Sequence, residues 1–171
     1  LESHHPRGSA YVIGEPGLTH ALYNAGYTMN DVNPDYVVVG ETRSYSYEKI
    51  ECAINLIRRG AKLIGTNPDL TDRTRHGLAP ATGALIAPIE LATGIQAYFV
   101  GKPNPMMMRH AMRRLGCSRE ECVVIGDRMD TDIIAGTNAD IDTVLVLSGV
   151  TERSDLRRFA YQPRYIFENV G

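Results

Sequence analysis

The chain has 171 residues, of which 43% are hydrophobic and 22% are charged, and its formal net charge is −2. No apolar run approaches the roughly 20 residues of a membrane-spanning helix, and the polar N-terminus lacks the apolar segment of a secretory signal. So small a charge provides no field that would attract nucleic acid. We therefore expect neither membrane nor nucleic-acid partners.

The first half alternates short apolar runs with helical patterns. Residues 35–40 are a β-branched run that ends in glycine, which is typical of a strand buried on both faces. Residues 47–59 carry apolar side chains at the spacing of an amphipathic helix. The elements expected here are strands at 10–14, 35–40 and 62–66, and helices at 17–25, 47–59 and 81–93, the last in spite of Pro88.

The second half continues the alternation. The elements expected are strands at 97–101, 121–126, 142–147 and 165–167, and helices at 105–115 and from 131 to 137. Strands and helices joined by connections this short favour an α/β fold with parallel sheets. A domain boundary is expected between residues 93 and 97, where a helix ends at Thr93-Gly94.

Three cysteines, Cys52, Cys117 and Cys122, lack the spacing of a zinc site. Cys52 falls within a helical pattern, whereas Cys117 and Cys122 flank a turn before a strand. The simplest interpretation is reduced thiols in a cytoplasmic protein.

Asp127 directly follows the strand expected at 121–126, and Gly126 permits a tight turn before it. Ligands of parallel sheets bind beyond the carboxyl ends of the strands. Asp130 and Asp132 follow in the same loop, and clustered carboxylates suit Mg²⁺. Alternatively, Asp130 or Asp132 only caps the next helix.

Lys102 follows the strand expected at 97–101, one strand unit before Asp127, so both side chains could face one crevice. A lysine there can neutralise a phosphoryl group or keep a carboxylate ionised. A surface lysine before a proline turn is the alternative. The ordered pair of Gly-Lys-Pro and Gly-Asp-x-x-x-x-Asp is more informative than either motif alone.

This ordered pair resembles the third and fourth motifs of the haloacid dehalogenase superfamily. Residues 143–150 are similar to the segment that follows them in its NagD-like, nitrophenylphosphatase-type branch. Residues 33–41, 65–69 and 83–85 are similar to the α/β cap domain of that branch. The resemblance implies a cap at residues 1–96 and the C-terminal part of a Rossmann-like core at residues 97–171.

The resemblance also implies roles for individual residues. Asp127 would be a direct Mg²⁺ ligand, and Asp132 would support the metal-binding loop without contacting the metal directly. Lys102 would contact the phosphoryl group and the nucleophilic aspartate. The residues expected near the substrate are Arg128, Met129, Asp130 and Thr131 in the core, and Asn67 and Asp69 in the cap. For Asn67 and Asp69, a simple loop-turn role is an equal alternative to selecting the leaving group.

The family's nucleophile is the first aspartate of an Asp-x-Asp motif after the first core strand, and its second aspartate is the general acid/base. Asp130-Thr131-Asp132 already belongs to the metal loop, and Asp140-Ile141-Asp142 precedes a strand rather than following one. The chain also does not begin with Met. We therefore expect an N-terminal core segment that is missing from this chain, and a chain that is inactive alone.

The function implied by the resemblance is Mg²⁺-dependent hydrolysis of small phosphorylated metabolites, such as nucleoside monophosphates or sugar phosphates, through an aspartyl-phosphate. The cap would close over the core during the reaction. The main alternative is a non-catalytic relative that binds phosphate or a metabolite without turnover. A response-regulator-like domain would need more acidic residues after the first strand than Glu15 alone. A homo-oligomeric state is left open.

Overall fold

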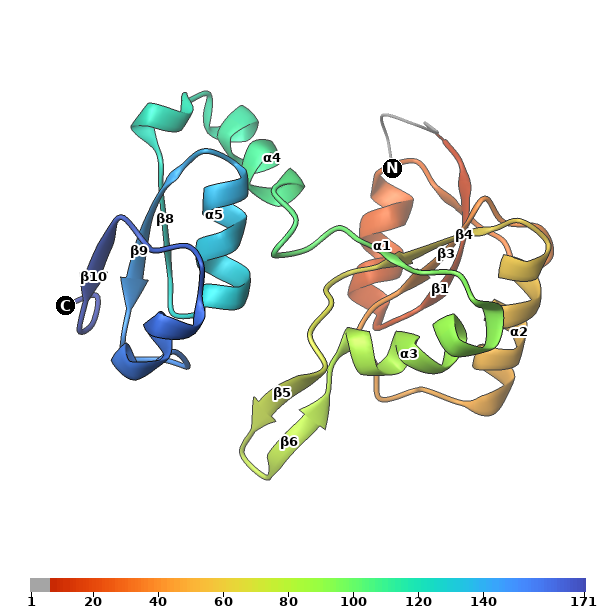
Figure 1. The fold of residues 1–171 in the computed structure, drawn as a ribbon. Coiled ribbons are helices and arrows are strands. Elements are labelled where there is room, and N and C mark those ends of the chain that lie inside the picture. Colours follow the sequence, from red (N-terminus) through yellow and green to blue (C-terminus); the bar gives the residue numbers. More distant parts are fainter. Residues whose placement is uncertain (1–6) are drawn as a thin grey trace. The chain divides into compact units, whose positions relative to one another are not determined.

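A computed structural model describes residues 7–171 of the chain. It divides into two compact units, Leu1–Val100 and Gly101–Gly171, and a parallel sheet lies in each (Figure 1). This confirms the α/β class expected from the alternating pattern. No helix within residues 7–171 combines the length and the apolar character needed to cross a membrane.

The first unit is built on a parallel sheet with the strand order β2-β1-β3-β4-β7. Its strands are β1 (Ser9–Ile13), β2 (Thr28–Met29), β3 (Tyr36–Val39), β4 (Lys62–Gly65) and β7 (Tyr98–Phe99). All four residues of the central strand β3 are buried, as expected for a strand that is covered on both faces.

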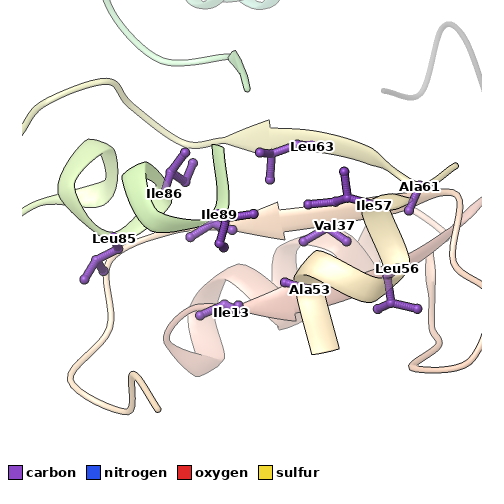
Figure 2. Packing of buried hydrophobic residues seen from close by; sticks show 11 residues of the cluster. Ile13, Val37, Ala53, Leu56, Ile57, Ala61, Leu63, Leu85, Ile86 and Ile89 are labelled. Carbon is purple, nitrogen blue, oxygen red and sulfur yellow. The ribbon is translucent and has the colours of Figure 1, made fainter. Parts of the chain in front are cut away.

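Helices cover both faces of this sheet. They are α1 (Pro16–Asn24), α2 (Tyr47–Arg58) and α3 (Thr82–Thr93). Because side chains alternate along a strand, Val37 and Val39 pack with α2 and α3, as Figure 2 shows for Val37. Tyr36 and Val38 pack on the other face with Leu22 of α1. The main hydrophobic core of the first unit therefore lies between β3 and the α2–α3 pair.

Three features of the first unit differ from the expectation. The short edge strand β2 and the antiparallel hairpin of β5 (Thr71–Thr74) and β6 (Gly77–Pro80) were not expected, and the hairpin projects from the sheet (Figure 1). The strand expected at 97–101 has only two residues, and it pairs with β4. The boundary expected at 96 and 97 would have placed this strand in the second unit.

The second unit contains a parallel sheet with the strand order β10-β9-β8. Its strands are β8 (Val123–Gly126), β9 (Asp142–Val146) and β10 (Tyr165–Phe167). Its helices are α4 (Met106–Leu115) and α5 (Ile134–Asn138), with short helices η1 (Arg119–Glu121), η2 (Met129–Ile133) and η3 (Arg153–Arg158). The helix expected from residue 131 therefore begins earlier, as the π-helical turn η2, and continues into α5.

A small core holds the second unit together. Met129 and Ile133 of η2 are fully buried with Leu145 of β9. By contrast, β8 pairs only with β9 among residues 7–171, and its Val123 and Ile125 are 50% and 56% exposed. One edge of this sheet is thus open and carries apolar side chains.

Candidate functional site

Asp127 lies at the carboxyl end of β8, where the sequence places it. The loop after β9 holds it from the side, because Val150 N donates to Asp127 Oδ2 at 2.8 Å and Thr151 N donates to Asp127 O at 3.1 Å. Gly149 packs directly on this carboxylate: a Cβ atom there would lie 2.0 Å from Asp127 Oδ2. The loop 149–151 therefore fixes the direction of the Asp127 side chain.

Asp132 is the buried carboxylate of the site, with only 6% of its surface exposed. Its Oδ1 accepts a charged hydrogen bond from Lys102 Nζ at 2.6 Å, and its Oδ2 accepts one from Arg128 N at 3.1 Å. Gly126 makes room for it, since a Cβ atom at Gly126 would lie 2.2 Å from Asp132 Cβ. Both oxygens of Asp132 are occupied by partners within the chain.

Lys102 reaches this carboxylate by a route that differs from the expectation. It was expected to follow a strand one strand unit before that of Asp127 and to face the same crevice, but β7 belongs to the sheet of the first unit. Lys102 is already part of the second unit and precedes α4. Its side chain is 41% exposed, so it bonds to Asp132 while remaining accessible to solvent.

The π-helical turn η2 carries the residues between Asp127 and Asp132. Met129 N donates to Thr151 Oγ1 at 3.2 Å, and Met129 O accepts from the Tyr161 hydroxyl at 2.9 Å. Met129 and Thr131 are buried, at 0% and 4% exposure. Their side chains are part of the interior, whereas the family resemblance implies that both residues lie near the substrate.

Arg128 and Asp130 form the accessible side of the same loop. The Arg128 guanidinium donates to both oxygens of Asp130, at 3.1 and 2.9 Å. This bond lowers the pKa of Asp130 below its ordinary value. Burial raises the pKa of Tyr161, and the negative charge of the nearby Asp130 carboxylate raises it further. Asp130 is therefore a paired, ionised group beside the site.

Asn67 and Asp69 lie in the first unit, in the loop after β4. Asn67 Oδ1 accepts from Asp69 N at 3.1 Å, which is the bond of an asparagine turn, and Asn67 Nδ2 donates to Glu41 Oε1 at 3.5 Å. The carbonyl of Asp69 accepts from Gly83 N at the start of α3. Both residues thus have the loop-turn bonds that were one of their two expected roles.

Thr151 and Tyr161 are among the residues of this site that the sequence did not reveal. Each acts on Met129 from more than twenty residues away, and neither lies in a motif. The similarity noted for residues 143–150 stopped one residue before Thr151.

Comparison with known proteins places this geometry in a family. Residues 99–171 match a family model described as HAD-hydrolase-like. The whole chain is 49% identical to the dihydroxyacetone phosphatase of Corynebacterium glutamicum and covers 62% of it. Over 162 residues, 95% of the chain, it is 45% identical to the ribonucleotide monophosphatase NagD of Escherichia coli and covers 64% of it.

A solved structure agrees with these relatives. The p-nitrophenyl phosphatase from Archaeoglobus fulgidus matches 98% of the chain with a TM-score of 0.90 and 34% identity, and the chain covers 67% of it. The chain belongs to the haloacid dehalogenase superfamily. Its relatives place it in the NagD-like branch, which confirms the resemblance found in the sequence. The chain spans less than two thirds of the length of the two phosphatases named first.

The carboxylate oxygens of this haloacid dehalogenase site are compatible with Mg²⁺ binding. No residue within 7–171 donates a hydrogen bond to Asp127 Oδ1, whereas both oxygens of Asp132 are occupied. No group of three or more His, Cys, Asp or Glu side chains that could hold a metal occurs in that range. Asp127 can supply one carboxylate, which suits an ion that binds one or two carboxylates together with waters and phosphate oxygens.

Proposed function

We propose that the full-length protein is a Mg²⁺-dependent phosphomonoester hydrolase of the NagD-like branch. Its substrates would be small phosphorylated metabolites such as nucleoside monophosphates or sugar phosphates. The observation that carries the proposal is the arrangement of Asp127, Asp132 and Lys102 beyond the carboxyl end of β8. The phosphatases named among the relatives support it.

In this proposal, the Asp127 carboxylate would hold the metal. The bound Mg²⁺ would neutralise the oxygens of the transferring phosphoryl group. Asp132 already accepts hydrogen bonds from Lys102 and the Arg128 amide, and we assign it no direct bond to the metal. It holds Lys102 in place instead, and the accessible ammonium of Lys102 contacts the phosphoryl group and the nucleophile.

We further propose that the nucleophilic aspartate lies outside these 171 residues. The aspartates of Asp130-Thr131-Asp132 are engaged with Arg128 and Lys102. Asp142 is the first residue of β9, so it and Asp140 lie at the amino end of that strand, away from the end at which Asp127 follows β8. The missing aspartate would attack phosphorus to form an aspartyl-phosphate, which water then hydrolyses.

The open edge of β8 supports this part of the proposal. An additional parallel strand would pair with the backbone of β8, and the segment that carries this strand would shield Val123 and Ile125, which are half-exposed in this structure. Parallel strands end on the same side of a sheet, so the residues after the added strand would lie next to Asp127. An Asp-x-Asp motif in that position would complete the site.

The two units have separate proposed roles. The second unit would be the C-terminal part of the core, and the first unit would be the α/β cap domain, with Asn67 and Asp69 as candidates for selecting the leaving group. Arg128 and Asp130 would approach the substrate, whereas the buried Met129 and Thr131 would contribute through the backbone of η2.

Release of inorganic phosphate tests this function. The full-length protein would be screened with nucleoside monophosphates, sugar phosphates, dihydroxyacetone phosphate and p-nitrophenyl phosphate, with Mg²⁺ or with a chelator. We expect hydrolysis that needs Mg²⁺, and none by the purified 171-residue chain. Binding of these compounds without turnover would favour the non-catalytic alternative. Hydrolysis by the 171-residue chain would contradict the position proposed for the nucleophile.

A further inference from the structure

Cys117 and Cys122 form a close pair of thiols at the amino end of β8. Their sulfur atoms lie 2.8 Å apart, nearer than two non-bonded sulfur atoms normally approach. All three cysteines of the chain are free and half-buried, but Cys52 lies in the first unit, far from this pair in the sequence. The pair is therefore a local feature of the second unit.

The turn between α4 and β8 brings the two thiols together. α4 ends at Leu115 and is capped by Gly116, whose φ of 69° is left-handed. The amides of Gly116 and Cys117 both donate to Met112 O. The single turn η1 follows, with Ser118 N donating to Glu121 Oε2 at 2.9 Å. Cys122 N closes this turn on Arg119 O. The positions of both cysteines are thus set by backbone hydrogen bonds.

Cys117 is also accessible from the surface. It lines a depression of about 600 Å³ in the second unit, together with three arginines and two residues of the α4 end: Arg109, Arg113, Arg119, Met112 and Gly116. Arg119 is paired with Glu120 and Asp140. The positive side chains favour the approach of a negatively charged reagent.

We propose that Cys117 and Cys122 are a dithiol modification site, which anionic small-molecule disulfides oxidise to an intramolecular disulfide bond. The Cys117 thiolate attacks one sulfur of the small disulfide, forming a mixed disulfide and releasing one small thiolate. The Cys122 thiolate then attacks the Cys117 sulfur, forms the Cys117–Cys122 bond and releases the second thiolate. The two protein thiols lose two electrons and two protons, and the small disulfide is reduced to two thiols.

The order of attack follows from the surroundings of the two sulfur atoms. Cys117 lines the depression, whereas Cys122 is not among its lining residues. The hydrogen bond to Cys117, and then burial, raise the pKa of Cys122 to about 11. Cys122 therefore keeps its proton to a higher pH than an ordinary thiol, and Cys117, which lines the depression, is the first nucleophile.

This site is independent of the proposed phosphatase function. Cys122 immediately precedes β8, whereas Asp127 follows the other end of the strand. Oxidation would close a short ring of residues 117–122 and fix the turn between α4 and β8. The test therefore needs no measurement of activity.

Peptide mapping after oxidation tests the proposal directly. The folded chain is incubated with glutathione disulfide, its remaining thiols are alkylated, and it is digested with trypsin without reduction. Cleavage after Arg114, Arg119 and Arg128 separates Cys117 and Cys122 into two peptides, residues 115–119 and 120–128. We expect these peptides to remain joined by a disulfide, while Cys52 is recovered alkylated.

Three variants sharpen the result. Cys122→Ser should stop at the mixed disulfide, with glutathione on Cys117, and Cys52→Ser should behave as the wild type. Glu121→Ala removes the bond to Ser118 N and should slow ring closure, with circular dichroism showing that the chain remains folded. Separate peptides from the folded wild type, or modification of Cys52 as fast as that of Cys117, would overturn the proposal.

Discussion

Lys102 Nζ and Asp132 Oδ1 are 2.6 Å apart, and this ion pair joins segments that lie 30 residues apart in the sequence. The Asp132 side chain is 9% exposed and that of Lys102 41%. The pair thus links the segment before α4 to the π-helical turn after β8. The pair also lies at the centre of the proposed chemistry of the second unit.

Removing the lysine should therefore destabilise the fold. In Lys102→Met, the buried Asp132 carboxylate keeps only the Arg128 amide as a partner. We expect a loss of about 1–2 kcal/mol in the free energy of unfolding, since the exposed lysine end weakens the pair. Urea denaturation measures it. In a double-mutant cycle with Asp132→Asn, the double variant should lose less stability than the sum of the two single variants; strict additivity would show that the pair contributes nothing.

Gly126 should tolerate no side chain. Its added Cβ would lie 2.2 Å from Asp132 Cβ, so Gly126→Ala must displace Asp132 or the end of β8. We expect a loss of about 2 kcal/mol or more in the free energy of unfolding, as is typical of overpacking. Gly17→Ala is the matched control, because no atom lies within 4 Å of its added Cβ in α1. Equal stability of the two variants would argue against the close packing described here.

The Arg128–Asp130 pair should be visible in a pH titration. The guanidinium lowers the pKa of Asp130 from its ordinary value of 3.8, so Arg128→Gln should raise the midpoint measured by NMR at the Asp130 carboxyl carbon. Because the folded-state pKa is lowered, the stability from this pair is present above pH 3.8 and is lost as the pH falls through the folded-state value.

For this exposed pair we expect a difference of about 0.5 kcal/mol or less at neutral pH. Asp140, which forms its ion pair with Arg119, is the control carboxyl group and should titrate alike in both proteins. An unchanged Asp130 midpoint in Arg128→Gln would remove the assigned cause of the shift.

Tyr161 should stabilise η2 through its hydroxyl group. In Tyr161→Phe, the carbonyl of the buried Met129 loses one of its donors and keeps the Ile134 amide. We expect a loss of about 1 kcal/mol in the free energy of unfolding. Tyr23→Phe, at a tyrosine that is 69% exposed, should change it far less. A larger effect at Tyr23 than at Tyr161 would contradict this role.

The position of Asp127 could be predicted because a local pattern sets it: an apolar strand, a glycine and an aspartate. The hydrogen bonds to that aspartate could not be predicted, because Val150 and Thr151 lie in the loop after β9, more than 20 residues further along the chain. The resemblance implied roles for Lys102 and Asp132 separately but did not indicate that they pair. Nor did the loop sequence show that Met129 points into the core.

The fold shows the same division between local and long-range information. β3 is predictable because a strand buried on both faces is a continuous apolar run. α2 is predictable because a helix buried along one stripe has apolar residues at helical spacing. The hairpin β5–β6 has only one residue that is not exposed, so no apolar alternation marks it. β7 has two residues, and its sheet is decided by pairing with β4, which no pattern within 97–101 reveals.

The most direct test of the central claim is Mg²⁺-dependent phosphate release by the full-length protein beside its Asp127→Asn variant. Asp140→Asn is the matched control, because Asp140 is an exposed aspartate of the same unit away from the site. Loss of a metal ligand should lower the rate by at least about 100-fold, since a small misplacement of the reacting groups is already this costly. We predict this loss in Asp127→Asn alone, with Asp140→Asn as active as the wild type. Equal activity of Asp127→Asn and the wild type would contradict the assignment of Asp127 to the metal site.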